Sequence, residues 1–190
     1  GGDSGWRMHY QYLPDRGPFN RERIWEPFHR EQPAYIVPPI ANLTDGPSGL
    51  AYYPGTGFGD QLNEKFLICD FRGGPANSGI RSFRLEPEGA FYRLAEDSDP
   101  IWNVLATDVA FGPDGALYVS DWVDGWDGLG KGRIYRLTDP AHSRSDTVLE
   151  VQRLLEGEWQ ERTVEELREG LAHVDRRIRF ESQWELARRG

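Results

Sequence analysis

The chain has 190 residues, with 22 basic and 31 acidic side chains and a formal net charge of −9. A domain holds roughly 150 residues, so this length corresponds to one domain, or to one domain and part of another. The acidic balance argues against a protein that binds duplex nucleic acid, because phosphate contacts need a cationic face. No run of about 18 apolar residues indicates a membrane span.

The composition changes near residue 149. All 13 prolines and 19 of the 22 glycines precede it, between short aromatic and β-branched runs, which is typical of short strands joined by turns. Residues 150–190 contain 18 charged residues, no proline and apolar residues at helical spacing. We therefore predict a sheet domain over 1–142, a linker over 143–149 and a helical segment over 150–190.

An internal repeat organises the sheet part. The first copy has strands expected at 49–53, 66–70 and 79–85, and the second has strands expected at 108–111, 117–121 and 132–137. The copies lie about 59 residues apart, and the middle strand of each ends in an aspartate, Asp70 or Asp121. Strand, turn, buried strand, polar loop and strand is the pattern of a β-propeller blade. The expected fold is therefore mainly β, a partial β-propeller of about two blades, with a β-sandwich as the alternative.

Two blades do not close a propeller, since four to eight are typical. We expect the chain to be a piece of a longer protein whose remaining blades are its partners. The alternative is a small sheet domain that only resembles blades.

The helical segment carries two start signals. Thr163 and Glu166 have the spacing of a capping box, and Asp175 is placed to cap a second helix. The two helices predict a short α-helical hairpin like the unit of HEAT repeats. Because one such unit cannot bury its own apolar face, further downstream helical repeats are expected as partners.

Candidate site residues lie where predicted strands end, which is where propeller loops gather around the central channel. Asp70 and Arg72 are either a functional pair or a structural ion pair that fixes the loop. Asp108 is either a ligand-binding carboxylate or a partner of backbone amides in the adjacent turn.

The loop that follows the strand 117–121 is a candidate metal site. It offers Asp121, Asp124 and Asp127 at a spacing of three, among glycines that let backbone carbonyls join, as hard cations such as calcium prefer. The alternative is a set of turn-forming aspartates beside packed tryptophans.

The remaining residues with metal or redox chemistry predict no site. The four histidines His9, His29, His142 and His173 have no pair at helical spacing. The single cysteine, Cys69, excludes an internal disulfide or a cysteine-rich zinc cluster. Because Cys69 lies in an apolar strand, we expect a buried, inert thiol.

Several segments together resemble the glucose/sorbosone dehydrogenase family. They are 1–6 (Gly-Gly-Asp-Ser-Gly-Trp), 46–53 (Gly-Pro-Ser-Gly-Leu-Ala-Tyr-Tyr), 66–71 and 114–119. With 121–126 (Asp-Trp-Val-Asp-Gly-Trp) and the helical tail, the sequence is most similar to the planctomycete and verrucomicrobial membrane-bound type. The resemblance implies a six-bladed propeller that oxidises sugars with pyrroloquinoline quinone, followed by HEAT repeats and a haem-binding module outside this chain.

The resemblance also implies where a cofactor would bind. Ser48 falls near a hydroxyl residue of the family's site, and Arg72 falls where a lysine binds the anionic quinone; an arginine fork suits a carboxylate. Asp70 and Asp108 are the other cofactor-binding candidates. The family's arginine pair would fall between Asn103 and Asp108, where this sequence has no arginine. The family's general base and most of its calcium ligands fall upstream, so no catalytic residue is assigned in this chain.

The function expected of the full-length protein is that of a quinone-dependent oxidoreductase. It would act on carbohydrate hydroxyls and pass electrons to haem, in the periplasm or as a secreted protein, with this chain alone inactive. The alternative is a non-catalytic propeller module that binds a ligand or a protein partner.

Overall fold

The computed structural model describes residues 40–41, 43–126 and 130–190. These residues form two compact units. The first contains the described residues up to 51, together with 65–109 and 119–135, and the second contains 52–64, 110–118 and 136–190. Within the described part of the chain, no helix is both long enough and apolar enough to span a membrane.

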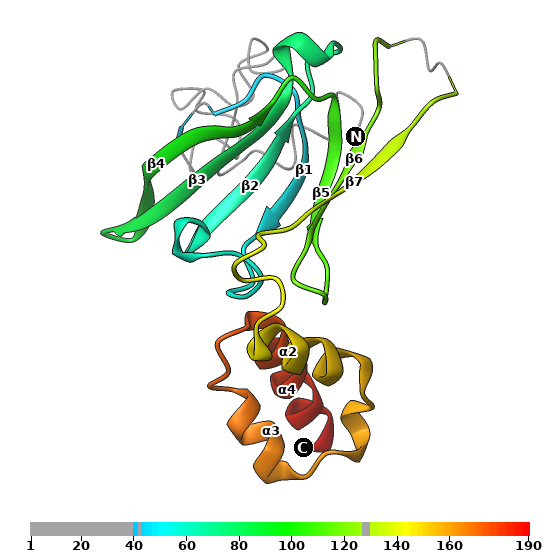
Figure 1. Ribbon diagram of the computed structural model, residues 1–190. Helices are drawn as coiled ribbons and strands as arrows, with labels where there is room; N and C mark the ends of the chain where they lie inside the picture. The colour runs from blue at the N-terminus through cyan, green and yellow to red at the C-terminus, as the bar shows by residue number, and fades with distance from the viewer. Residues whose placement is uncertain (1–39, 42, 127–129) are drawn as a thin grey trace. The chain divides into compact units, whose positions relative to one another are not determined.

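Within the described residues, seven strands form two sheets (Figure 1). One sheet has the order β1-β2-β3-β4, and the other has the order β5-β6-β7. Their bounds are β1 Pro47–Tyr52, β2 Lys65–Asp70, β3 Gly79–Glu88, β4 Phe91–Trp102, β5 Ala106–Phe111, β6 Leu117–Asp121 and β7 Arg133–Leu137. Each of the six strands expected from the repeat is present, so the mainly β class is confirmed. Two consecutive meanders agree with the expectation of two propeller blades. The described residues do not form a closed ring.

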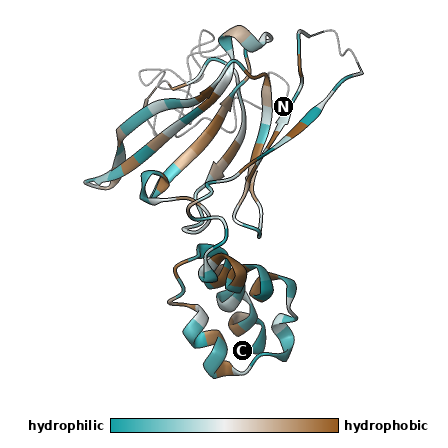
Figure 2. Ribbon diagram, in the orientation of Figure 1, coloured by the Kyte–Doolittle hydropathy of each residue, from teal (hydrophilic) through white to brown (hydrophobic). Residues whose placement is uncertain are grey.

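The longest strand, β4, was not expected from the sequence. Its centre reads Glu-Asp-Ser-Asp-Pro, residues that strands disfavour. It lies at the edge of its sheet, where proline is tolerated because no outer neighbour needs its N–H. Antiparallel pairing with β3 places acids of β4 opposite arginines of β3, as in Arg84–Glu96 at 2.9 Å and Arg81–Asp99 at 2.7 Å. Figure 2 shows hydrophilic residues along much of β4.

The core of the first unit lies between the middle strands. Leu43, Ile68 and Phe83 are buried together, and the ring of Phe66 stacks on that of Phe83 at 5.0 Å. Cys69 is fully buried, as predicted, and its burial raises the pKa of the thiol to about 12. This apolar centre fixes β2, whose last residue opens the candidate site.

The carboxyl-terminal part contains three α-helices, α2 Asp146–Glu156, α3 Val164–Gly170 and α4 Arg176–Arg189 (Figure 1). The capping box at Thr163 and the cap at Asp175 are confirmed. The predicted linker over 143–149 is too long, because Ser145 caps α2 through a hydrogen bond from the Val148 N–H and starts the helix there. The helical segment is therefore a hairpin of α3 and α4 preceded by an additional helix.

The second unit packs α2, α3 and α4 around a separate core. Val151, Trp159, Leu167 and Ile178 are buried in it. The unit also includes segments 52–64 and 110–118, which the sequence placed in the sheet domain. They join the helices through backbone contacts such as the Arg176 N–H to the Pro54 carbonyl at 2.8 Å.

Candidate functional site at the end of β2

The last residue of β2, Asp70, is a buried carboxylate with every oxygen occupied. Its side chain is fully buried, and its Oδ1 accepts hydrogen bonds from the backbone N–H groups of Asp45 at 3.2 Å and Gly46 at 2.9 Å. Its Oδ2 accepts from Arg72 Nε at 3.0 Å and Nη2 at 2.6 Å. A buried charge is tolerated only when it is paired and hydrogen-bonded, and both conditions are met here.

The guanidinium of Arg72 is held between two carboxylates. In addition to Asp70, its Nη1 lies 3.0 Å from Asp45 Oδ2, and the Asp45 side chain is 72% exposed. The hydrogen bond to Asp70 raises the pKa of Arg72 against the opposing effect of partial burial. The Arg72 N–H donates to Ser78 Oγ at 2.9 Å, and that hydroxyl donates to the Gly74 carbonyl at 2.6 Å. Ion pairs and hydrogen bonds therefore hold the loop after β2 in place at both of its ends.

An exposed indole lies against the same loop. The ring of Trp126 meets that of Phe71 edge-on at 4.9 Å, and Trp126 is 72% exposed. A Cβ on Gly73 would lie 2.0 Å from Trp126 Nε1, so the indole sits directly against the glycine backbone. The Arg72 guanidinium also lies 5.9 Å from the ring centre of Trp102. Two indole rings and the charged side chain of Arg72 therefore lie close together at the loop after β2.

Two of the predicted cofactor residues serve backbone groups instead. Ser48 Oγ donates to the Ala106 carbonyl at 3.4 Å, which links β1 to β5. Asp108 is exposed, and its Oδ1 accepts from the Val109 N–H at 2.8 Å. Asp108 thus follows the alternative reading, in which it bonds the adjacent backbone. The structure brings Asp70 and Arg72 together, and among the described residues it forms no hydrogen bond between that pair and Ser48 or Asp108.

The candidate metal loop is built as a turn. Asp121 is buried, its Oδ1 accepts from the Val123 N–H at 2.9 Å, and its Oδ2 lies 3.9 Å from Arg133 Nη1. Asp124 is exposed, and Asp127 lies outside the described residues. Within the described part of the chain, no group of three or more His, Cys, Asp or Glu side chains is arranged to hold a metal ion. Trp122 and Trp126 of this loop are both exposed, and the ring of Trp126 packs against Phe71.

The residues described here do not fit the anionic quinone that the resemblance implies. Arg72 is the only cation assigned to that site, and two carboxylates already compensate its charge. A carboxylate ligand would have to displace Asp45 and would remain next to buried Asp70, where like charges repel. The segment 1–6, His9 and His29, which the sequence analysis also considered, lie outside the described residues.

Sequence reasoning missed the parts played by Trp126 and Asp45. The available signal for Trp126 was the glycine-rich turn after Arg72, since Gly73 leaves a flat surface on which a ring can rest. Asp45 gave no signal, because its contact with Arg72 depends on how the chain enters β1.

Comparison with known proteins gives little further constraint. No family model matches the chain, and no curated protein matches it. One solved structure that is similar is the "putative oxidoreductase (glucose dehydrogenase)" from Thermus thermophilus, with 24% sequence identity and a TM-score of 0.35. The match covers 47% of this chain and 24% of that protein. The matched region thus spans about a quarter of that protein, and this likeness does not establish a family.

Proposed function

We propose that this chain is part of a sugar-dehydrogenase-like β-propeller protein and that the end of β2 binds a neutral carbohydrate. The observation that carries the proposal is the exposed indole of Trp126, which rests on Gly73 beside the ion pairs of Arg72. A sugar ring presents C–H groups on its face and hydroxyls at its edge. An aromatic face flanked by fixed charged groups offers partners for both.

The charges at the end of β2 favour a neutral ligand over an anion. Asp45 carries an exposed carboxylate that accepts hydrogen bonds from hydroxyls, and Arg72 supplies donors at the same point. Because Asp70 holds the arginine fork in one orientation, these donors do not have to be ordered when the ligand binds. The ligand therefore meets a preorganised polar edge.

The finer assignment concerns the whole protein. There we propose a quinone-dependent oxidoreductase in the periplasm or secreted, with calcium at its cofactor and haem in a module outside this chain. The remaining blades and further helical repeats are its proposed partners. No step of the oxidation is assigned to the residues described here, since Arg72 is already engaged with two carboxylates.

A second candidate is a non-catalytic propeller module that binds a ligand or protein. The observation that favours it is the same engagement of Arg72 by Asp45 and Asp70, which leaves no uncompensated charge for an anionic cofactor. The two candidates share the carbohydrate site and differ in whether the full-length protein also transfers electrons.

The carbohydrate site is tested by NMR titration of the purified chain with glucose and a glucose disaccharide. We expect saturable shifts of the Trp126 indole N–H at millimolar concentration. Trp126→Ala should weaken binding at least tenfold, which corresponds to about 1.4 kcal/mol. Trp184→Ala is the matched control, because that indole is also exposed but belongs to α4. Equal binding by the two variants, or no saturable shift, would refute the site.

The quinone is tested separately, by titrating the chain and the full-length protein with pyrroloquinoline quinone and calcium. We expect no binding by the chain alone. Binding and sugar-dependent dye reduction by the full-length protein would support the oxidoreductase. Sugar binding without dye reduction would support the non-catalytic module.

A further inference from the structure

A concavity of about 430 Å³ lies in the second unit, where β7 leads into α2. It is lined by Arg136, Thr138, Pro140, Ser143 and Arg144. The lining contains two guanidinium groups and two hydroxyls, and no carboxylate belongs to it. In a chain with a net charge of −9, a hollow lined with cations and no acid is a local exception.

Arg136, the first arginine of this hollow, is held in place by an ion pair. Arg136 donates through Nε at 2.9 Å and Nη2 at 2.7 Å to Asp114 Oδ2, and Tyr118 donates its hydroxyl to the same oxygen at 3.0 Å. Burial opposes ionisation of Asp114, but the hydrogen bonds from Arg136, Ala116 and Tyr118 outweigh it and lower the pKa of the carboxyl. Asp114 therefore stays ionised and holds the fork. No partner is formed by Arg136 Nη1 within the described part of the chain.

Arg144, the second arginine of the hollow, has no such ion pair among the described residues. Arg144 is exposed, and it makes no ion pair or hydrogen bond with the residues that the structure describes. It shares the hollow with Arg136, whose charge Asp114 compensates, so Arg144 brings to the hollow a positive charge with no partner among the described residues. An uncompensated guanidinium favours an anionic occupant.

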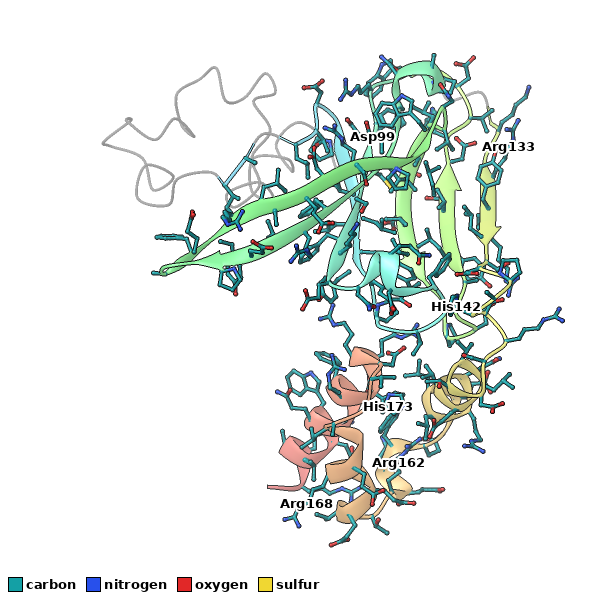
Figure 3. All side chains as sticks on the ribbon, turned by 60° about the vertical axis from the view of Figure 1, so that its left-hand side comes forward. Asp99, Arg133, His142, Arg162, Arg168 and His173 are labelled. Carbon is teal, nitrogen blue, oxygen red and sulfur yellow. The ribbon has the colours of Figure 1, made fainter. Side chains whose placement is uncertain are left out.

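The turn that carries Thr138 and Ser143 is rigid. Asp139 accepts hydrogen bonds from the Ala141 N–H at 3.0 Å and from the ring of His142 at 2.7 Å, and its carbonyl accepts the Ser143 N–H at 2.8 Å. The hydrogen bond with His142 lowers the pKa of Asp139. Figure 3 labels His142 at this turn. Asp139 is thus engaged with its own turn, and the backbone that carries Ser143 is held in place.

We infer that this hollow is a binding site for a tetrahedral oxyanion, a phosphate or sulfate group. Guanidinium forks and hydroxyl donors are the groups that recognise such oxyanions. The volume is within the range of small-ligand sites and exceeds what a free oxyanion fills, so there is room for an ester carrying a sugar or similar group. The inference does not depend on the carbohydrate site at the end of β2, because no residue is shared.

The test is a titration of the purified chain with inorganic phosphate, inorganic sulfate, glucose 6-phosphate and glucose, followed by backbone NMR. We expect saturable shifts of amides within 136–146 with the three anions and none there with glucose. Tighter binding of glucose 6-phosphate than of inorganic phosphate identifies an ester as the ligand, and equal binding identifies the free anion. Absence of saturable shifts up to tens of millimolar with every anion overturns the site.

Two variants separate this site from general attraction to positive charge. Arg144→Gln should weaken anion binding about tenfold, because it removes the uncommitted guanidinium. Arg153→Gln removes the same charge from the exposed face of α2, outside the hollow, and should leave binding unchanged. Thr138→Val, which keeps every charge, should weaken binding severalfold by deleting one hydroxyl. Equal losses in Arg144→Gln and Arg153→Gln, with no effect of Thr138→Val, would refute the inference.

Discussion

The two units each contain an Asp-x-Arg pair with a buried aspartate. In the first unit, Asp70 and Arg72 are joined at 2.6 Å between Oδ2 and Nη2; in the second, Asp175 and Arg177 are joined at 2.7 Å between the same atoms. Both aspartates are fully buried. Arg72 Nε donates to the same oxygen, Asp70 Oδ2, at 3.0 Å, whereas Arg177 Nε donates to the other oxygen, Asp175 Oδ1, at 3.0 Å. The pairs also differ in what the remaining guanidinium nitrogen contacts.

The contacts of Nη1, the remaining guanidinium nitrogen, distinguish the roles of the two pairs. Arg177 Nη1 donates to the Phe111 carbonyl at 3.2 Å and to the Gly112 carbonyl at 2.8 Å, so the arginine ties the start of α4 to a distant turn. Arg72 Nη1 instead faces the exposed carboxylate of Asp45. Backbone carbonyls cannot leave without unfolding, whereas an exposed carboxylate can turn into solvent. The second pair is therefore structural, and the first is available to a ligand.

The largest expected effect is that of Arg177→Ala. It leaves Asp175 buried without its counter-charge and deprives two carbonyls of a donor, so we expect the free energy of unfolding to fall by about 3–5 kcal/mol. Arg72→Ala should cost about 1–2 kcal/mol less, because the Arg72 guanidinium donates to no backbone carbonyl of the described residues. Chemical denaturation followed by far-UV circular dichroism measures both. Arg153→Ala, an exposed arginine of α2, is the control. A larger loss for Arg72→Ala would reverse the comparison.

Two glycines, Gly55 and Gly73, test the same contrast between a contact with fixed backbone and a contact with an exposed side chain. Gly55 has φ +109°, and an added Cβ would lie 2.6 Å from the Val174 carbonyl oxygen, which is backbone and cannot move aside. Gly73 has φ +84°, but the atoms nearest to its added Cβ belong to the exposed indole of Trp126, which can swing away. We expect Gly55→Ala to cost about 2–3 kcal/mol and Gly73→Ala about 1 kcal/mol.

The readout for the glycine pair is thermal unfolding together with tryptophan fluorescence. Gly73→Ala should shift the emission of Trp126 and weaken carbohydrate binding, whereas Gly55→Ala should lower stability and leave binding by the folded protein unchanged. Equal destabilisation by the two substitutions would show that the indole is held as firmly as the carbonyl.

Sequence reasoning succeeded where the signal is local. The capping box at Thr163 and the cap at Asp175 depend on residues within one helical turn, and the strands of the repeat depend on short apolar runs. Asp70 and Arg72 were singled out because they end such a strand. Asp70 itself matches the structural alternative, since both of its oxygens are occupied, whereas Arg72 Nη1 faces the exposed carboxylate of Asp45.

The features that were missed depend on distant partners. The edge strand β4 is stabilised by arginines of β3 rather than by its own composition. The part played by Arg177 rests on carbonyls some 65 residues away in the chain. Ser145 was placed in a linker because the flanking residues are polar, although a serine before a periodic run is an equally good helix cap.

Acid should weaken the pair formed by Asp175 and Arg177. Burial alone would raise the pKa of Asp175, but hydrogen bonds from Arg177 and Thr56 outweigh it and hold that pKa below its ordinary value. A group with a lowered folded-state pKa stabilises the protein above its unfolded-state pKa, about 3.9 for aspartate, and loses that contribution as the pH falls through the folded value. The gap in unfolding free energy between the wild type and Asp175→Asn should therefore narrow below pH ~4. A gap that stays constant from pH 7 to pH 3 would contradict this assignment.

The smallest expected effect on stability is that of Asp45→Asn. The carboxylate is largely exposed, and exposed ion pairs contribute little, so the free energy of unfolding should change by less than about 0.5 kcal/mol. The substitution nevertheless removes one of the two negative charges that compensate Arg72. If the end of β2 is closed to anions because of that compensation, Asp45→Asn should bind pyrroloquinoline quinone or acetate measurably better than the wild type, by about tenfold for one charge-assisted contact. Unchanged anion affinity together with a loss of more than 1 kcal/mol would mean that Asp45 is as structural a partner as the carbonyls of Phe111 and Gly112, and the difference between the two Asp-x-Arg pairs would then disappear.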